Sequence, residues 1–178
     1  MLSHIYIDHN VWDFLYERNI DLAKELPSEN FALHLTREAV FEISPTPDSK
    51  RSYIEKTILR CNIDVKPYFG FYDDQHSLSE QRMGGLGFGY LASEEEAIFI
   101  QSQKPKLSVS KKPKTGLFKN EADIALAARS FHSIVLTLDK KPGPLKNALS
   151  QGGKVVFLGE IDTSILSLQE FIFSAIQA

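Results

Sequence analysis

Cysteine is nearly absent from this 178-residue chain, in which Cys61 stands alone. A single cysteine can form neither an internal disulfide framework nor a cysteine-rich zinc site, which fits a reducing, cytoplasmic setting. The sequence also lacks an apolar run long enough to span a bilayer, and its N-terminus lacks a basic segment followed by an apolar stretch. We therefore expect no membrane insertion and no secretion signal.

Positive charge is not in excess, because 20 Lys and Arg residues against 23 Asp and Glu residues give a formal net charge of -3. This balance excludes a generally cationic coat for nucleic acid but leaves room for a local basic patch. Hydrophobic residues make up 43% of the chain, enough for a core, so disorder of the whole chain is not expected. The length suits one domain.

Strand-like and helix-like segments alternate at both ends of the chain, which predicts an α/β fold with a largely parallel sheet. Strands are predicted over 4–8, 133–138 and 154–158, and residues 31–36 read as a strand or as the lead-in to a helix. Helices are predicted from Asn10 to Pro27, after a Thr36 cap, over 49–61, over 93–103, after an Asn120 cap, over 145–150 and over 163–176. Residues 45–115 read as an insertion into this scaffold, so 1–178 is expected to be a single domain.

Acidic residues occur where predicted strands end and where one predicted helix begins. Asp8 ends the first strand and Asp139 ends the strand 133–138, while Glu121 and Asp123 lie in the first turn of the helix between them. The carboxyl ends of parallel strands and the amino ends of the following helices share one edge of a sheet, where ligands bind. We therefore expect these acids to meet at that edge.

Converging carboxylates repel one another, by about 4 kcal/mol for two unit charges 4 Å apart at an effective dielectric constant of 20. Protonation, a lysine or arginine, or a divalent cation can offset this repulsion. Mg²⁺ and Mn²⁺ prefer oxygen ligands, can convert a bound water into a nucleophile and can neutralise a phosphate. The acids therefore favour a nuclease hypothesis.

Each acid also has a purely structural interpretation. Asp8 could cap the helix that starts near Asn10. Glu121 and Asp123 suit the first turn of any helix, because acids there interact favourably with the helix dipole. Asp139 could be an ordinary turn residue before Pro142.

Three segments together resemble the PIN domain family, metal-dependent ribonucleases that include toxins of toxin–antitoxin pairs. They are "IYIDHNVWDFL", "TREAVFEI" and "NEADIALAARSFHSIVLTLDKK", and the likeness covers about the first 44 and roughly the last 60 residues. The resemblance implies a three-layer α/β/α fold with a central, mostly parallel sheet. It also implies an Mg²⁺- or Mn²⁺-dependent endoribonuclease that hydrolyses RNA phosphodiester bonds.

The same resemblance implies the residues of the site. The catalytic residues would be Asp8, Glu42, Glu121 and Asp139, with Asp8, Glu121 and Asp139 as metal ligands and Asn10 and Thr137 as polar supports. The family commonly has Asp at the position of Glu121, so Asp123 could serve instead. Ile124 and Ala128 share the helix face of Glu121, which favours Glu121. Lys140 and Lys141 stand where many relatives carry a further acid, so a single metal ion is expected.

A basic segment precedes the acidic helix, and residues 101–120 contain six lysines and no acid. Either these lysines contact the RNA backbone or they form a solvated loop; the candidates for RNA binding are Lys111, Lys112, Lys114 and Lys119. The apolar C-terminal stretch is expected to pack within the domain, with a homodimer or an antitoxin-like partner as the other candidates for covering it. The alternative to an enzyme is a catalytically degenerate PIN-like module that binds RNA or a protein partner.

Overall fold

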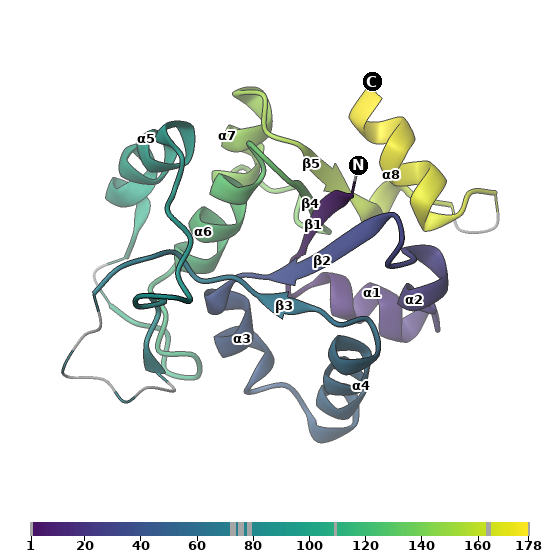
Figure 1. The fold of residues 1–178 in the computed structure, drawn as a ribbon, viewed down its shortest axis with the longest axis horizontal. Helices are drawn as coiled ribbons and strands as arrows, with labels where there is room; N and C mark the ends of the chain where they lie inside the picture. The colour runs from purple at the N-terminus through teal and green to yellow at the C-terminus, as the bar shows by residue number, and fades with distance from the viewer. Residues whose placement is uncertain are drawn as a thin grey trace.

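A single parallel sheet forms the centre of the molecule (Figure 1). The computed structural model describes residues 2–71, 74, 77, 80–108, 110–162 and 165–177. In this part of the chain five strands are arranged in the order β3-β2-β1-β4-β5, all parallel. They are β1 (Ser3–Ile7), β2 (Phe31–Leu35), β3 (Asp64–Val65), β4 (Ile134–Thr137) and β5 (Val155–Phe157). The prediction of an α/β fold with a parallel sheet is confirmed.

Helices cover both faces of the sheet and give a three-layer α/β/α arrangement (Figure 1). The helices that share a core with one face are α1 (Val11–Glu17), α2 (Leu22–Glu25), α3 (Arg37–Ile43), α4 (Asp48–Arg60) and α8 (Leu168–Gln177). On the other face lie α5 (Glu94–Gln103), α6 (Glu121–Arg129) and α7 (Pro144–Ser150). Short 3-10 helices span Lys104–Lys106 and Leu158–Glu160.

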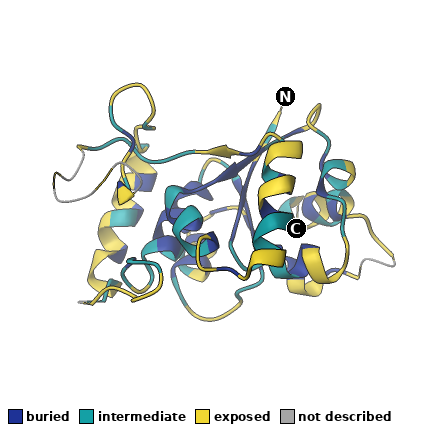
Figure 2. Ribbon diagram, turned by 90° about the horizontal axis from the view of Figure 1, so that it is seen from below, coloured by how far each residue is buried: buried dark blue, intermediate teal, exposed yellow. Residues whose placement is uncertain are grey.

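Alternate residues of β1, β4 and β5 supply the two cores. On β1, Ile5 and Ile7 enter the larger core around the fully buried Trp12, whereas Tyr6 enters the smaller one. The smaller core includes Ala127 and Ala128 of α6, whose short side chains let this helix lie close to the strands. Figure 2 shows the resulting pattern, with buried residues on the sheet and exposed residues on the outer sides of the helices.

The predicted boundaries hold for most elements, and three expectations need correction. The expected helix from Asn10 to Pro27 is broken into α1 and α2, because Asn19 adopts a left-handed conformation with φ of 52°. Asn120 precedes α6 but does not cap it: its φ is 68°, and its side chain donates to the carbonyl of Lys106 instead. The last helix begins at Leu168, and residues 163 and 164 of the predicted range lie outside the described residues.

The segment 45–115, expected to be an insertion, contributes its first part to the scaffold. Within it, α4 packs into the larger core through Ile54, and β3 extends the sheet beside β2. The exposed two-residue β3 carries no strand pattern that the sequence could reveal. From Lys66 onward the segment leaves the sheet and reaches α5 on the other face.

The C-terminal helix packs on the larger core. Leu168 and Ile172 of α8 are buried in it, and the Glu25 carboxylate accepts a hydrogen bond from the Leu168 N–H at 2.7 Å. Across the described residues, no helix has both the length and the apolar character needed to cross a bilayer.

Candidate functional site

Asp8 lies at the carboxyl end of β1 and is held by two neighbouring polar side chains. It is 7% exposed, and its Oδ2 accepts hydrogen bonds from Thr137 Oγ1 at 2.6 Å and from Asn10 Nδ2 at 2.7 Å. Asn10 Oδ1 in turn accepts from the Leu138 N–H at 2.8 Å, which ties the end of β1 to the end of β4. Asn10 and Thr137, which the resemblance implies as polar supports, therefore both donate hydrogen bonds to Asp8.

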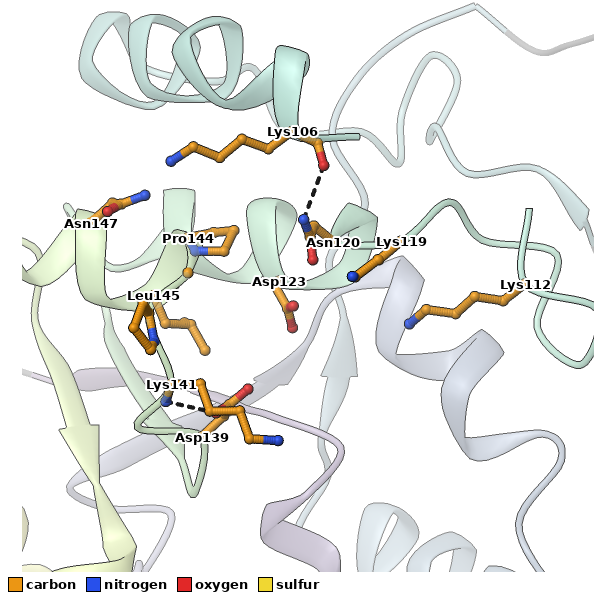
Figure 3. Close-up of a pocket in the computed structure, with 12 residues that line it drawn as sticks. Lys106, Lys112, Lys119, Asn120, Asp123, Asp139, Lys141, Pro144, Leu145 and Asn147 are labelled. Atoms are coloured by element: carbon orange, nitrogen blue, oxygen red, sulfur yellow. Dashed lines mark hydrogen bonds between the residues drawn. The ribbon is translucent and has the colours of Figure 1, made fainter. Parts of the chain in front are cut away.

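Asp139 and Asp123 complete this edge from β4 and α6. The N–H of Asp139 donates to Thr137 Oγ1 at 3.0 Å, and Asp139 Oδ1 accepts from the Lys141 N–H at 2.9 Å. Asp123 extends from α6 toward Asp139 across a cavity (Figure 3). The carboxyl ends of two strands and the amino end of a helix thus place acids from remote segments at one edge of the sheet.

The pKa values show how strongly the acids affect one another. Burial, with smaller contributions from the charges of Asp123 and Glu42, raises the pKa of Asp8 to about 6 against the lowering effect of the Thr137 hydrogen bond. Burial also raises the pKa of Asp123, with a contribution from Asp139, and the pKa of Glu42, with a contribution from Asp123. The four carboxyl groups therefore form one electrostatically coupled cluster, which we call the acid cluster.

One lysine enters the acid cluster. Lys112 Nζ lies 3.4 Å from Glu42 Oε1, and its charge lowers the pKa values of both Glu42 and Asp123. A turn over 110–118 positions it, with the Lys112 N–H donating to the carbonyl of Leu117 at 2.7 Å. Lys112 therefore offsets part of the repulsion among the acids.

Glu121 lies apart from the acid cluster. Its Oε1 accepts from Arg82 Nε at 2.6 Å, and its Oε2 accepts from the Phe118 N–H at 2.7 Å. The left-handed Asn120 sets the entry into α6, so that Glu121 faces back toward Phe118 while Asp123 faces the cavity. The structure therefore brings together Asp8, Glu42, Asp123 and Asp139, and not Glu121.

A cavity of about 740 Å³ adjoins Asp123 and Asp139 (Figure 3). Its polar lining includes Lys106, Lys112, Lys119, Asn120, Lys141 and Asn147. Of the four lysines predicted to bind RNA, Lys112 and Lys119 face this cavity, whereas Lys111 and Lys114 line a different one. Lys106 and Lys141 were not among the predicted residues, although one lies in the basic segment and the other follows Asp139 by two residues.

The acid cluster offers the carboxylate oxygens that Mg²⁺ and Mn²⁺ prefer, but the side chains stand apart. In the described part of the chain, no three His, Cys, Asp or Glu side chains are grouped closely enough to hold a metal ion as they are placed. Asp123 and Asp139 are only partly buried, whereas Asp8 is buried. The residues fit such a cation by donor chemistry and charge.

Comparison with protein-family models and with curated proteins finds no match. Among solved structures, the chain is similar to a domain of a functionally unknown protein from Methanocaldococcus jannaschii DSM 2661. The two are 16% identical, the alignment covers 90% of this chain and 94% of that chain, and the TM-score is 0.37. At that TM-score the likeness carries no argument about fold or function.

Proposed function

We propose that this chain is a PIN-like endoribonuclease that depends on Mg²⁺ or Mn²⁺ and hydrolyses RNA phosphodiester bonds. The observation that carries the proposal is the acid cluster, four coupled carboxyl groups beside a lysine-lined cavity at the carboxyl edge of a parallel sheet. Raised pKa values across several acids at one site are typical of functional sites rather than of solvated surfaces.

The proposed ligands of the cation are Asp8, Asp123 and Asp139, with Glu42 nearby. A divalent cation held by these residues would lower the pKa of a bound water and would supply positive charge for the phosphate. Thr137 fixes the Asp8 carboxylate with a hydrogen bond of 2.6 Å, so that its other oxygen keeps one direction. This carboxylate is held in place by its neighbours, whereas the two other proposed ligands are only partly buried.

The acid cluster repels RNA, which is a polyanion, and the lysines at the cavity offset this repulsion. Lys106, Lys119 and Lys141 line the cavity that adjoins Asp123 and Asp139. Lys and Arg side chains bind nucleic acid through its phosphates, largely without regard to sequence. The cavity therefore suits the backbone of a single RNA strand that passes the acids.

Replacement of Asp8 by Asn tests the proposal. Asp8→Asn keeps an oxygen that can accept the Thr137 hydrogen bond but removes the charge, so RNA cleavage in the presence of Mg²⁺ or Mn²⁺ should fall at least 100-fold, a typical order of loss for a group that acts on the reacting centre. Glu29→Gln is the matched control, since Glu29 is an exposed acid in the turn before β2, at the opposite edge of the sheet. Equal cleavage by Asp8→Asn and the parent protein would contradict the proposal.

The ion pair between Lys112 and Glu42 favours a second function, that of a non-catalytic module that binds RNA or a protein partner. An ammonium group beside an acid cluster can substitute for part of the charge of a metal ion. Titration with Mn²⁺ separates the two functions: binding at sub-millimolar concentration supports the nuclease. RNA binding without Mn²⁺ binding at millimolar concentration supports the module.

A further inference from the structure

A second cavity, of about 500 Å³, lies on the other side of the first turns of α6. Its walls are largely apolar and include Tyr68, Phe69, Met83, Ile100, Phe118 and Ile124. Cavities of this size with apolar walls and a few polar groups are typical of sites for small molecules or for single groups of a larger ligand. We call it the Glu38 cavity, after the buried acid that lines it.

Glu38 is a buried acid of this cavity, and the hydrogen bond recorded for its carboxyl group comes from its own backbone N–H. It is 9% exposed, and no other residue in the described ranges forms a hydrogen bond with its carboxyl group. Arg82, which also lines the cavity, is already bound to Glu121 at 2.6 Å and to the carbonyl of Gly116 at 2.6 Å. Burial raises the pKa of Glu38 to about 7, against the lowering effects of its own backbone N–H and of the Arg129 and Arg82 charges.

The chemistry of the cavity defines what it can bind. A carboxylate has two acceptor oxygens and no donor, so it is matched by a group with two adjacent N–H donors. Apolar and aromatic walls favour a flat ring that can stack on them. Guanine presents N1–H and N2–H side by side on its Watson–Crick edge, whereas the same edges of adenine, cytosine and uracil mix donors with acceptors.

We propose that the Glu38 cavity binds a guanine base of the RNA substrate, with the Glu38 carboxylate accepting hydrogen bonds from N1–H and N2–H. The role as a substrate subsite rests on the proposed ribonuclease function. The placement supports it, because α6 separates the two cavities: Asp123 lines one, and Ile124 and Ala125 line the other. A single strand that passes the acid cluster can turn one unstacked base into the Glu38 cavity, the usual way in which proteins read RNA sequence.

Nucleoside monophosphates in EDTA provide the first test, because binding is then measured without metal and without cleavage. Titration calorimetry and amide chemical shifts should show GMP binding at least 10-fold tighter than AMP, CMP or UMP. IMP, which lacks the N2 amino group, should bind about 10-fold more weakly than GMP. The largest shifts should fall on Phe118, Ile124 and Met83, which line the cavity.

Two variants test separately whether Glu38 selects guanine and whether the base binds in the Glu38 cavity. Glu38→Gln should reduce the preference for GMP over AMP to less than 3-fold, and it removes an unpaired buried charge, so it should fold. Ala97→Phe, at an exposed α5 position that lines the cavity, should weaken GMP binding at least 10-fold with Glu38 intact. Equal affinity for GMP and AMP in the parent protein, or unchanged GMP affinity in Glu38→Gln, would overturn the guanine assignment.

RNA cleavage tests the guanine subsite and the nuclease activity separately. With Mg²⁺ present, an oligonucleotide that contains guanine should be cut faster than its inosine-substituted counterpart by the parent protein, and at nearly the same rate by Glu38→Gln. If the parent protein cut the guanine and inosine oligonucleotides at the same rate, the subsite would be refuted while the proposed nuclease would stand. GMP selectivity without any cleavage would refute the nuclease and leave a guanine-binding site.

Discussion

At the scale of single residues, Asp8 shows how the fold keeps a charged group in an unfavourable place. Burial and two neighbouring acids raise its pKa to about 6, so its charged form is destabilised when no cation is bound. Asp8→Asn removes this charge and should raise the free energy of unfolding by about 1 to 2 kcal/mol in EDTA at pH 8. Urea denaturation checks this, and a loss of stability instead would show that the carboxylate is not under strain from its neighbours.

Asp123 and Glu121 are two residues apart, and the structure predicts opposite consequences for their replacement. Asp123→Asn should weaken Mn²⁺ binding at least 10-fold with little effect on stability, because Asp123 faces the cavity and has no ion pair among the described residues. Glu121→Gln should leave Mn²⁺ binding within about 3-fold of the parent. It should lower the free energy of unfolding by about 1 to 2 kcal/mol, because Arg82 loses its carboxylate partner. Calorimetric titration and thermal unfolding of the two variants decide between these assignments.

His34 gives stability a pH dependence unrelated to the acid cluster. Burial, followed by the nearby His4 and Lys66, lowers its pKa from 6.5 to about 4 in the folded protein. The unfolded chain therefore binds a proton at His34 before the folded protein does, and stability present above pH 6.5 is lost as the pH falls. Between pH 7 and pH 5 the loss should be about 2 kcal/mol.

His34→Gln should remove this part of the pH dependence, because a glutamine does not titrate. The difference in unfolding free energy between His34→Gln and the parent should therefore change by about 2 kcal/mol between pH 7 and pH 5. His132→Gln, at an exposed position after α6, is the control. Parallel stability curves for the parent and His34→Gln would show that His34 titrates normally.

At the scale of elements, sequence reasoning succeeds where local pattern and backbone geometry agree. Thr36 was predicted to cap the helix 37–43, and its Oγ1 accepts from the Ala39 N–H at 3.2 Å. A helix was predicted over 93–103, and α5 starts there after Ser93, which forms a reciprocal capping box with Glu96. Asp8 and Asp139 were placed at one edge by topology alone, because parallel strands end on the same side.

The parts that could not be predicted depend on contacts between remote segments. The register of α6 was judged from its apolar face, which favoured Glu121 over Asp123 as the ligand. Arg82, from a segment without regular pattern, reaches Glu121 across 39 residues of sequence and holds it away from the acids. No local signal predicts such a contact, just as none predicts the left-handed Asn120 that starts the helix.

The basic segment before α6 divides into two sides that should behave differently toward RNA. Lys112 and Lys119 line the cavity beside the acids, whereas Lys111 and Lys114 line another cavity near Phe41. The double replacement Lys112→Ala with Lys119→Ala should weaken RNA binding and lower the slope of log affinity against log salt by about 1 to 1.5, since about 0.7 is lost per contact with a single strand. Fluorescence anisotropy over a salt series measures it.

The matched control is Lys111→Ala with Lys114→Ala, which removes the same charge from the same loop. This double variant should retain most of the affinity and the salt slope of the parent protein, because Lys111 and Lys114 line a cavity other than the one beside Asp123 and Asp139. Equal effects of the two double variants would mean that the whole loop contributes as diffuse charge.

At the scale of the whole molecule, the acid cluster joins parts of the chain that are far apart. Asp8 follows β1, Glu42 lies on α3, Asp123 on α6 and Asp139 after β4, so only the complete sheet brings these acids together. A cation held at the acid cluster by Asp8, Asp123 and Asp139 would therefore bind the folded protein and not the unfolded chain. Its binding must stabilise the fold as a whole.

Thermal unfolding with and without Mn²⁺ tests this linkage. At a free Mn²⁺ concentration ten times the dissociation constant, the stabilisation is about 1.4 kcal/mol. For a chain of this length that corresponds to a rise in Tm of about 3 to 6 °C. The rise should disappear in Asp8→Asn and persist in Glu29→Gln, because the first lacks a proposed ligand and the second lacks an acid at the opposite edge. A rise in Tm of equal size in all three proteins would assign the stabilisation to a cation bound elsewhere. No rise in the parent protein would contradict the proposal that the acid cluster binds a metal ion.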